Sequence, residues 1–193
     1  PTTGVVGPLT WAALTKDQKA KRTQTKKSAH KHKDKKAAKK SKKKVSKKPE
    51  TSRALENAED IAGIKRRERY AKVYLVKDGD DIAKIILPVR GYGLWSTLYG
   101  FMALEGNGNK VLGFGFYDHA ETPGLGGEVD NPNWKALWKG KEIYDDSGEV
   151  AVAIIKGNVQ PNSPTARYSV DGLAGATLTS RGVQNLIHYW MGE

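Results

Sequence analysis

Asp-Gly-Leu-Ala-Gly-Ala-Thr-Leu-Thr-Ser, at residues 171–180, places small residues and hydroxyls directly ahead of a helical pattern. Beyond it, apolar residues recur at positions i, i+3, i+4 and i+7, which is one face of an α-helix. Gly192 is placed to end this helix, and Thr179 or Ser180 is predicted as its N-cap. The amides at such a start have no intrahelical partners and lie at the positive end of the helix dipole, so the pattern predicts a phosphate site. The apolar residues are Val183, Leu186, Ile187 and Trp190.

The residues in front of these amides have little bulk. Gly175 and Ala176 leave space that a ligand could occupy. Simple capping of a C-terminal helix also explains the hydroxyls of Thr177, Thr179 and Ser180. The stretch by itself does not decide between a phosphate site and a cap.

The same stretch resembles the flavinylation motif Asp-x-x-(Ser/Thr)-Gly-Ala-Thr of bacterial membrane flavoproteins, whose last threonine carries FMN as a phosphoester. That threonine corresponds to Thr177, whereas Ala174 replaces the usual Ser or Thr. Two earlier stretches add to the resemblance, Gly-Tyr-Gly-Leu-Trp-Ser-Thr-Leu-Tyr-Gly-Phe at 91–101 and Glu-Thr-Pro-Gly-Leu-Gly-Gly-Glu at 121–128. In this order the three motifs resemble the C subunit of the sodium-translocating NADH:quinone oxidoreductase, over about residues 52–193.

The resemblance implies a covalent flavoprotein with FMN attached to Thr177. Such a chain is an electron-transfer subunit of a membrane complex and not a complete enzyme, and neither catalytic residues nor metal ligands are expected. Its partners would be the other subunits, with a separate flavin transferase that uses FAD and Mg²⁺ for maturation. The family also implies a bacterial inner-membrane complex with this domain on the periplasmic side. The FMN-binding residues expected from the two motifs are Asp171, Gly175, Ala176, Thr177, Leu178, Thr179, Glu121, Thr122, Gly124, Leu125 and Gly126.

The glycine-rich loop at 121–128 can approach a ligand closely with its backbone. Beside a phosphate-anchored flavin, its amides could bind the polar edge of the isoalloxazine, and Leu125 could cover a ring face. A loop that simply turns the chain is the alternative, because the spacing fits neither a dinucleotide fingerprint nor a P-loop.

Two further side chains are candidates for contact with the cofactor. Trp95 offers an indole plane as a wall for the flavin, with a core tryptophan as the alternative. Lys156 could pair with the phosphate or an electron-rich flavin edge, or be a solvated surface lysine. Asp171 is interpreted as orienting its loop or assisting the transferase. His119 and His188 have no partner at metal-ligand or triad spacing and are interpreted as structural.

Charge divides the chain unevenly. Residues 16–48 contain 17 Lys or Arg and two Asp, a net charge of +15 against +12 for all 193 residues, so the remainder carries −3. The predicted organisation is a partial peptidoglycan-binding-like remnant at 1–15, a Lys-rich disordered linker at 16–50 and an FMN-binding domain at 51–193. The sequence has no cysteine, which excludes disulfides and thiolate sites.

The basic tract at 16–48 suggests a second function, an adaptor that binds cell-wall polymers or other polyanions and carries an unmodified flavin domain. Specific nucleic-acid binding is not expected, because no aromatic residues interleave the lysines. The chain as written has no apolar run long enough for a membrane span and no signal-peptide pattern.

The globular part is predicted as α+β, with antiparallel strands and a few helices, because the regular β-α-β alternation of a doubly wound sheet is missing. A charged helix is expected over 55–69, with Ile61 and Ile64 as its apolar contacts. A turn at 77–80 joins two predicted strands into a hairpin. The predicted strands are 72–76, 82–89, 111–117 and 150–156, and a short helix is expected over 133–138.

Overall fold

The computed structural model describes residues 50–192. The predicted segment 1–15 and the basic linker at 16–50, except Glu50, lie outside the described residues. The described elements, in chain order, are β1 (Ser52–Ala54), β2 (Arg66–Glu68), β3 (Tyr74–Asp78), β4 (Asp81–Tyr92), β5 (Thr97–Glu105), β6 (Val111–Asp118), the 3-10 helix η1 (Gly126–Asp130), α2 (Pro132–Ala136), β7 (Ala153–Ile155), β8 (Ser169–Asp171) and α3 (Thr177–Met191).

A four-stranded antiparallel sheet, in the order β3-β4-β5-β6, forms the centre of this part of the chain. Buried and half-buried residues alternate along β5, because successive side chains of a strand point to opposite faces of the sheet. The buried face carries Leu98, Met102 and Leu104, together with Phe114 of β6. The predicted α+β class is confirmed.

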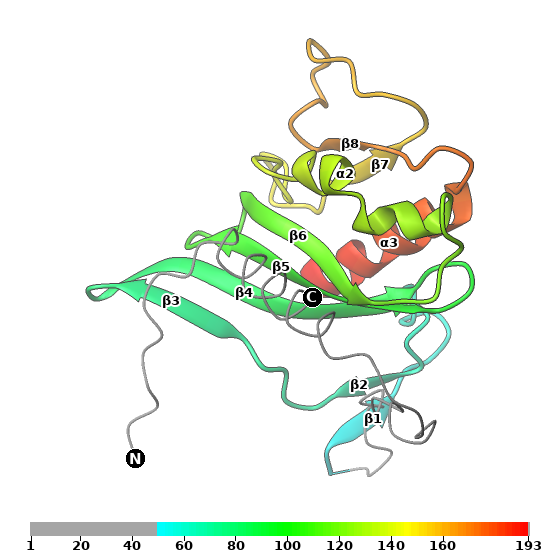
Figure 1. Ribbon diagram of the computed structural model, residues 1–193. Coiled ribbons are helices and arrows are strands. Elements are labelled where there is room, and N and C mark those ends of the chain that lie inside the picture. The colour runs from blue at the N-terminus through cyan, green and yellow to red at the C-terminus, as the bar shows by residue number, and fades with distance from the viewer. Residues whose placement is uncertain (1–49, 193) are drawn as a thin grey trace, which may run out of the picture. The chain divides into compact units, whose positions relative to one another are not determined.

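The helix α3 packs its apolar face against this sheet. Val183, Leu186 and Ile187 are fully buried and belong to the same core cluster as the sheet residues. The predicted helical face is therefore confirmed, as is the end at Gly192, whose amide donates to the carbonyl oxygen of His188. Figure 1 shows α3, α2 and the β7–β8 pair on the same side of the four-stranded sheet.

Two glycines allow α3 to approach the end of β4 closely. A Cβ on Gly91 would lie 2.6 Å from the Cβ of Leu186, and a Cβ on Gly182 would clash with the carbonyl oxygen of Tyr92. Larger residues at either position would push the helix away from the sheet. This packing brings the N-terminal half of α3 beside the start of the 91–101 motif.

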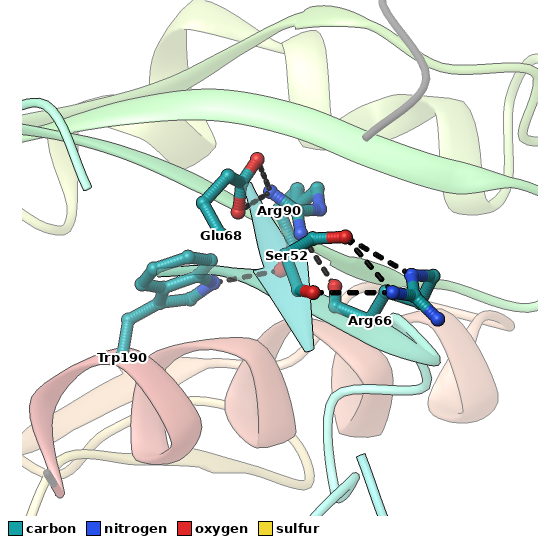
Figure 2. Close-up of polar contacts among 5 residues, drawn as sticks. All are labelled: Ser52, Arg66, Glu68, Arg90 and Trp190. Carbon is teal, nitrogen blue, oxygen red and sulfur yellow. Dashed lines mark hydrogen bonds and ion pairs between the residues drawn. The ribbon is translucent and has the colours of Figure 1, made fainter. Parts of the chain in front are cut away.

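Arg90 joins the small β1–β2 pair to the main sheet and to α3 (Figure 2). Its guanidinium donates to both carboxylate oxygens of Glu68, at 2.7 and 2.8 Å, and to the carbonyl oxygen of Arg66 at 2.8 Å. Its own carbonyl oxygen accepts a 2.8 Å hydrogen bond from Nε1 of Trp190. The side chain of Arg66 in turn donates to Ser52 of β1. Arg90 thus ties β2, β4 and α3 together, and Arg66 adds β1.

The predicted charged helix over 55–69 is wrong. The chain forms turns here and then enters β2. Lys65 has a φ of +63°, which a right-handed helix does not use. The carboxylate of Asp60 accepts hydrogen bonds of 2.7 Å from the amides of Ile64 and Lys65, and these local bonds compete with helix formation. Ile61, expected as an apolar contact, is 49% exposed.

The other predicted elements are present with shifted bounds, whereas β1, β2, β5 and β8 were not predicted. The hairpin is confirmed, since Asp78 pairs with Asp81 and Gly79 has a φ of +62° in the turn. The short helix is confirmed as α2, with Asn131 accepting from the amide of Asn133 at its start. The last predicted strand is shorter than expected, and β7 pairs in parallel with β8, so this small sheet departs from the antiparallel expectation.

Candidate functional site

The three sequence motifs meet at the carboxylate of Glu121. This residue begins the glycine-rich loop that follows β6, and only 5% of it is exposed. An acidic residue is seldom buried to this degree without partners. Its side chain reaches both the loop after β4 and the first turn of α3.

Five donors surround the carboxylate. Oε1 accepts from the amides of Trp95 and Ser96, each at 3.0 Å, and from Oγ of Ser96 at 3.1 Å. Oε2 accepts from the amide of Leu94 at 3.1 Å and from Oγ1 of Thr179 at 2.7 Å. These bonds replace the hydration that burial removes. One side chain therefore connects the loop at 93–96 to α3.

Glycines pack directly against this group. A Cβ on Gly93 would lie 2.7 Å from Oε1 of Glu121. A Cβ on Gly126 would lie 2.5 Å from Oγ1 of Thr179 and 2.9 Å from Oε2 of Glu121. All three distances are shorter than real Cβ contacts, so a side chain at either position would displace the hydrogen-bonded pair. Close packing on the carboxylate accounts for one glycine in each of the first two motifs.

The carboxylate of Glu121 is held in its ionised form. Burial acts to raise its pKa, but the hydrogen bonds from Thr179, Trp95, Leu94 and Ser96 outweigh burial and lower the pKa below the usual value for glutamate. The group is therefore a fixed negative charge at neutral pH. Its function in the fold depends on accepting hydrogen bonds and not on exchanging a proton.

The helix α3 begins at Thr177, so the predicted N-cap at Thr179 or Ser180 is wrong. The N-cap is Ala176, and no side chain among residues 50–192 caps it. Thr179 and Ser180 lie inside the first turn, 1% and 6% exposed, because their hydroxyls serve tertiary contacts. Oγ of Ser180 accepts from the amide of Leu173 at 3.1 Å, which fixes the loop before the helix.

Thr177 itself is exposed at the start of α3. Just before it, Gly175 has a φ of +69°, a conformation that side-chain-bearing residues rarely adopt. A Cβ on Gly175 would lie 3.0 Å from Cδ2 of Leu125. The motif at 171–180 and the glycine-rich loop are therefore neighbours in the fold.

Large apolar side chains reach the surface beside this turn. Trp95 is 66% exposed, Leu178 53% and Leu125 45%. The interpretation of Trp95 as a core residue is therefore wrong. Its backbone is nevertheless fixed, because its amide donates to Glu121. Trp95 stays available as the predicted wall for a flavin.

The other predicted loop residues lie at the surface or support it. Thr122 and Gly124 are exposed. The carbonyl oxygen of Thr122 accepts from the amides of Leu125 and Gly127, which closes the loop into a tight turn. Their contact with a cofactor stays a prediction.

Asp171 and Lys156 lie at the C-terminal ends of the parallel strands β8 and β7. Oδ1 of Asp171 accepts from the amide of Val159 at 2.8 Å, so this carboxylate orients the neighbouring loop. Lys156 is exposed, and its Cα lies 3.9 Å from the position of a Cβ on Gly172. The structure thus places Lys156 beside the first residues of the 171–180 motif.

Two residues that support the site were missed from the sequence. Ser96 bridges Glu121 and the amide of Ala120, with bonds of 3.1 and 2.8 Å. Nδ1 of His119 accepts from the amide of Glu121 at 3.2 Å, while Nε2 lies 3.0 Å from Oδ2 of Asp130. These partners are far apart in sequence and follow no periodic pattern. The structural interpretation of His119 agrees with these contacts.

Neither a metal centre nor a membrane span is evident between residues 50 and 192. No three His, Asp or Glu side chains of this part come together as metal ligands. None of its helices combines the length and apolar character that a bilayer crossing requires. His188 donates from Nε2 to the carbonyl oxygen of Val152 at 2.7 Å, which agrees with a structural role.

Comparison with known proteins identifies the family of this chain. The FMN-binding domain family matches residues 93–192, a range that includes all three motifs apart from the first two residues of the first. The chain is 67% identical over 145 residues to the C subunit of the Na(+)-translocating NADH-quinone reductase of Pseudomonas aeruginosa, and 52% identical over 141 residues to that of Yersinia pestis. These alignments cover 75% and 72% of this chain.

A solved structure shows the same fold. The crystal structure of Shewanella oneidensis NqrC matches with a TM-score of 0.70 and 38% identity, covering 83% of this chain and 72% of that one. The resemblance that the three motifs indicated is confirmed by these relatives. The chain spans about half the length of the curated relatives it matches, 56% and 52% for the two named above.

Proposed function

Because the chain belongs to the FMN-binding domain family, we propose that it carries FMN covalently, through a phosphoester to Oγ1 of Thr177, and serves in electron transfer within a larger complex. The observation that carries this function is the position of Thr177. Its side chain is exposed at the first residue of a 15-residue helix, in the turn that Glu121 fixes through Thr179.

The residues around Thr177 suit a phosphate joined to a flat aromatic ring. Amides in the first turn of α3, which no described side chain caps, favour an anion together with the helix dipole. Gly175 keeps the space beside Leu125 open, because a side chain there would meet Leu125. The exposed apolar surfaces of Trp95, Leu125 and Leu178 suit contact with an isoalloxazine. Lys156 is the proposed cationic partner of the phosphate.

Attachment requires an accessible hydroxyl and an external enzyme. Oγ1 of Thr177 would attack the flavin-side phosphorus of FAD and lose its proton, the bond from this phosphorus to the bridging oxygen would break, and AMP would leave with that oxygen. No electrons are transferred in this step. A flavin transferase with Mg²⁺ supplies the catalysis. Once attached, the flavin supplies the redox chemistry, while the chain binds, orients and partly covers it.

The names of the relatives indicate the setting. They are subunits of a Na(+)-translocating NADH-quinone reductase. We propose that this chain is a subunit of such a complex at a bacterial inner membrane, with the other subunits as its partners and its flavin domain on the periplasmic side. Electron transfer through the flavin would contribute to sodium transport by the whole assembly.

The basic tract supports an additional contact with polyanions. Its 17 Lys or Arg within residues 16–48 favour salt-sensitive binding to anionic polymers. Removal of residues 1–48 should abolish such binding and leave flavin attachment unchanged. Equal polyanion binding by the full and the shortened chain would reject this contact.

Co-expression with and without a flavin transferase tests the covalent attachment. The wild-type chain should give a fluorescent band in a denaturing gel only when the transferase is present, and Thr177→Ala should stay dark. Thr165→Val, in an exposed loop, is the control and should fluoresce like the wild type. A dark wild-type band contradicts attachment, and a fluorescent Thr177→Ala band contradicts the assigned residue.

A further inference from the structure

The carboxylate of Glu121 has no capacity left for a ligand. A carboxylate offers about four acceptor sites, and five protein donors already lie at 2.7–3.1 Å from its two oxygens. The side chain is also buried beneath Gly93 and Gly126. The resemblance implied that Glu121 lines the FMN site. In the structure, however, both of its carboxylate oxygens accept their hydrogen bonds from the protein itself.

We propose that Glu121 is a positioning residue, which joins the loop carrying Trp95 to the helical turn carrying Thr177 before the flavin is attached. This inference rests on the proposed attachment of FMN at Thr177. It assigns to Glu121 and Thr179 the alignment of the acceptor hydroxyl with the ring-binding wall, and not direct contact with the cofactor.

The carboxylate of Glu121 restrains both sides of the site, the helical turn that carries Thr177 and the loop that carries Trp95. Thr179 lies two residues after Thr177 in the first turn of α3, so its 2.7 Å hydrogen bond restrains the turn that presents the acceptor. The bond from the amide of Trp95 restrains the wall at 3.0 Å. Because both bonds end on the same carboxylate, a shift on one side is transmitted to the other. Such alignment lowers the cost of ordering when a ligand binds.

The five donors around Glu121 fit a carboxylate but do not fit the side chain of glutamine, its closest neutral substitute. All five groups point N–H or O–H toward Glu121. A glutamine would present an amide NH₂ in place of one oxygen, and at least one backbone N–H would then face a second donor. Glu121→Gln should therefore release one of the two segments despite its nearly identical shape.

Thr179→Val isolates the link to the acceptor turn. The substitution removes the hydroxyl with little change in volume and leaves the bonds from residues 94–96 to Glu121 in place. The experiment measures the initial rate of flavin attachment from FAD by the purified transferase. It also measures amide hydrogen exchange of the unmodified chain in peptides that cover 93–96 and 172–180.

We expect Thr179→Val to slow attachment at least tenfold and to speed exchange in 172–180, while Thr179→Ser restores the rate to within twofold. Glu121→Gln should slow attachment similarly and speed exchange in either segment. The matched control Thr165→Val should behave as the wild type. Wild-type attachment rates in both Thr179→Val and Glu121→Gln, or equal slowing in Thr179→Val and Thr179→Ser, would overturn the positioning role. Failure of the wild type to accept flavin at Thr177 would instead contradict the proposed function.

Discussion

Oγ1 of Thr179 donates a 2.7 Å hydrogen bond to Oε2 of Glu121, although the two residues are 58 positions apart in the sequence. Both side chains are almost fully buried, at 1% and 5% exposure. The bond closes the contact between the glycine-rich loop and the start of α3. It makes the surroundings of Thr177 one structural unit, in which a change to one motif should disturb the others.

Glu121→Ala should lower the free energy of unfolding by about 3 kcal/mol, because it leaves the buried donors of residues 94–96 and Thr179 without an acceptor. Urea unfolding followed by tryptophan fluorescence measures the loss. Glu149→Ala, at an exposed position, is the control and should leave stability unchanged. Equal stability of the two variants would show that the carboxylate is not required by the fold.

The contribution of Glu121 to the stability of the fold should decrease as the pH falls. Because hydrogen bonds lower its pKa in the folded state, the carboxylate contributes its full stability above the ordinary glutamate pKa of about 4.3, and loses it as the pH falls through the lowered value. The difference in melting temperature between the wild type and Glu121→Gln should therefore be large at pH 7 and shrink progressively below about pH 4. A difference that stays constant down to pH 3 would contradict this linkage.

Gly126→Ala should weaken the hydrogen bond between Glu121 and Thr179. The added Cβ would lie 2.5 Å from Oγ1 of Thr179, so the Glu121–Thr179 bond must lengthen. The expected cost is about 1–3 kcal/mol, which is typical of overpacking. Thermal unfolding measures this cost. If Gly126→Ala has the same melting temperature as the wild type, the loop accommodates the added Cβ without disturbing the hydrogen bond between Glu121 and Thr179.

Arg90→Ala should destabilise the junction of β1–β2, the main sheet and α3 by about 2 kcal/mol, since Glu68 and the carbonyl oxygen of Arg66 lose a charged donor. The side chain of Arg90 is only 11% exposed, so water does not replace these bonds easily. Arg53→Ala removes a pair with Glu59 that is exposed on both sides and should change little. Chemical denaturation compares the two variants, and equal losses would contradict the role of Arg90.

The sequence predicts the elements that depend on local periodicity. The apolar face of α3 and the hairpin of β3 and β4 follow directly from spacing and turn residues. The helix expected over 55–69 fails because the carboxylate of Asp60 binds the amides of Ile64 and Lys65, a local competition that hydrophobic spacing does not reveal. The parallel pairing of β7 with β8 depends on tertiary packing and has no signal in either strand.

The sequence predicts which residues form the candidate site better than it predicts what each of them does. Motif resemblance gathers Thr177, Trp95 and Leu125, and the structure brings their segments together. The motif resemblance does not reveal that Glu121 points into the protein or that Ser96 and His119 support this residue, because long-range hydrogen bonds produce no periodic pattern in the sequence. The N-cap assignment to Thr179 fails for the same reason, since a buried acceptor 58 residues away takes its hydroxyl.

Mass spectrometry of the tryptic peptide 168–181 tests the covalent attachment most directly, with protein purified from a host that contains a flavin transferase. The peptide should gain the mass of FMN less one water, and fragmentation should locate the gain on Thr177 and not on Thr179 or Ser180. Thr177→Ala should abolish it. An unmodified wild-type peptide from a host that flavinylates another substrate, or a gain that persists in Thr177→Ala, would contradict the phosphoester at the start of α3.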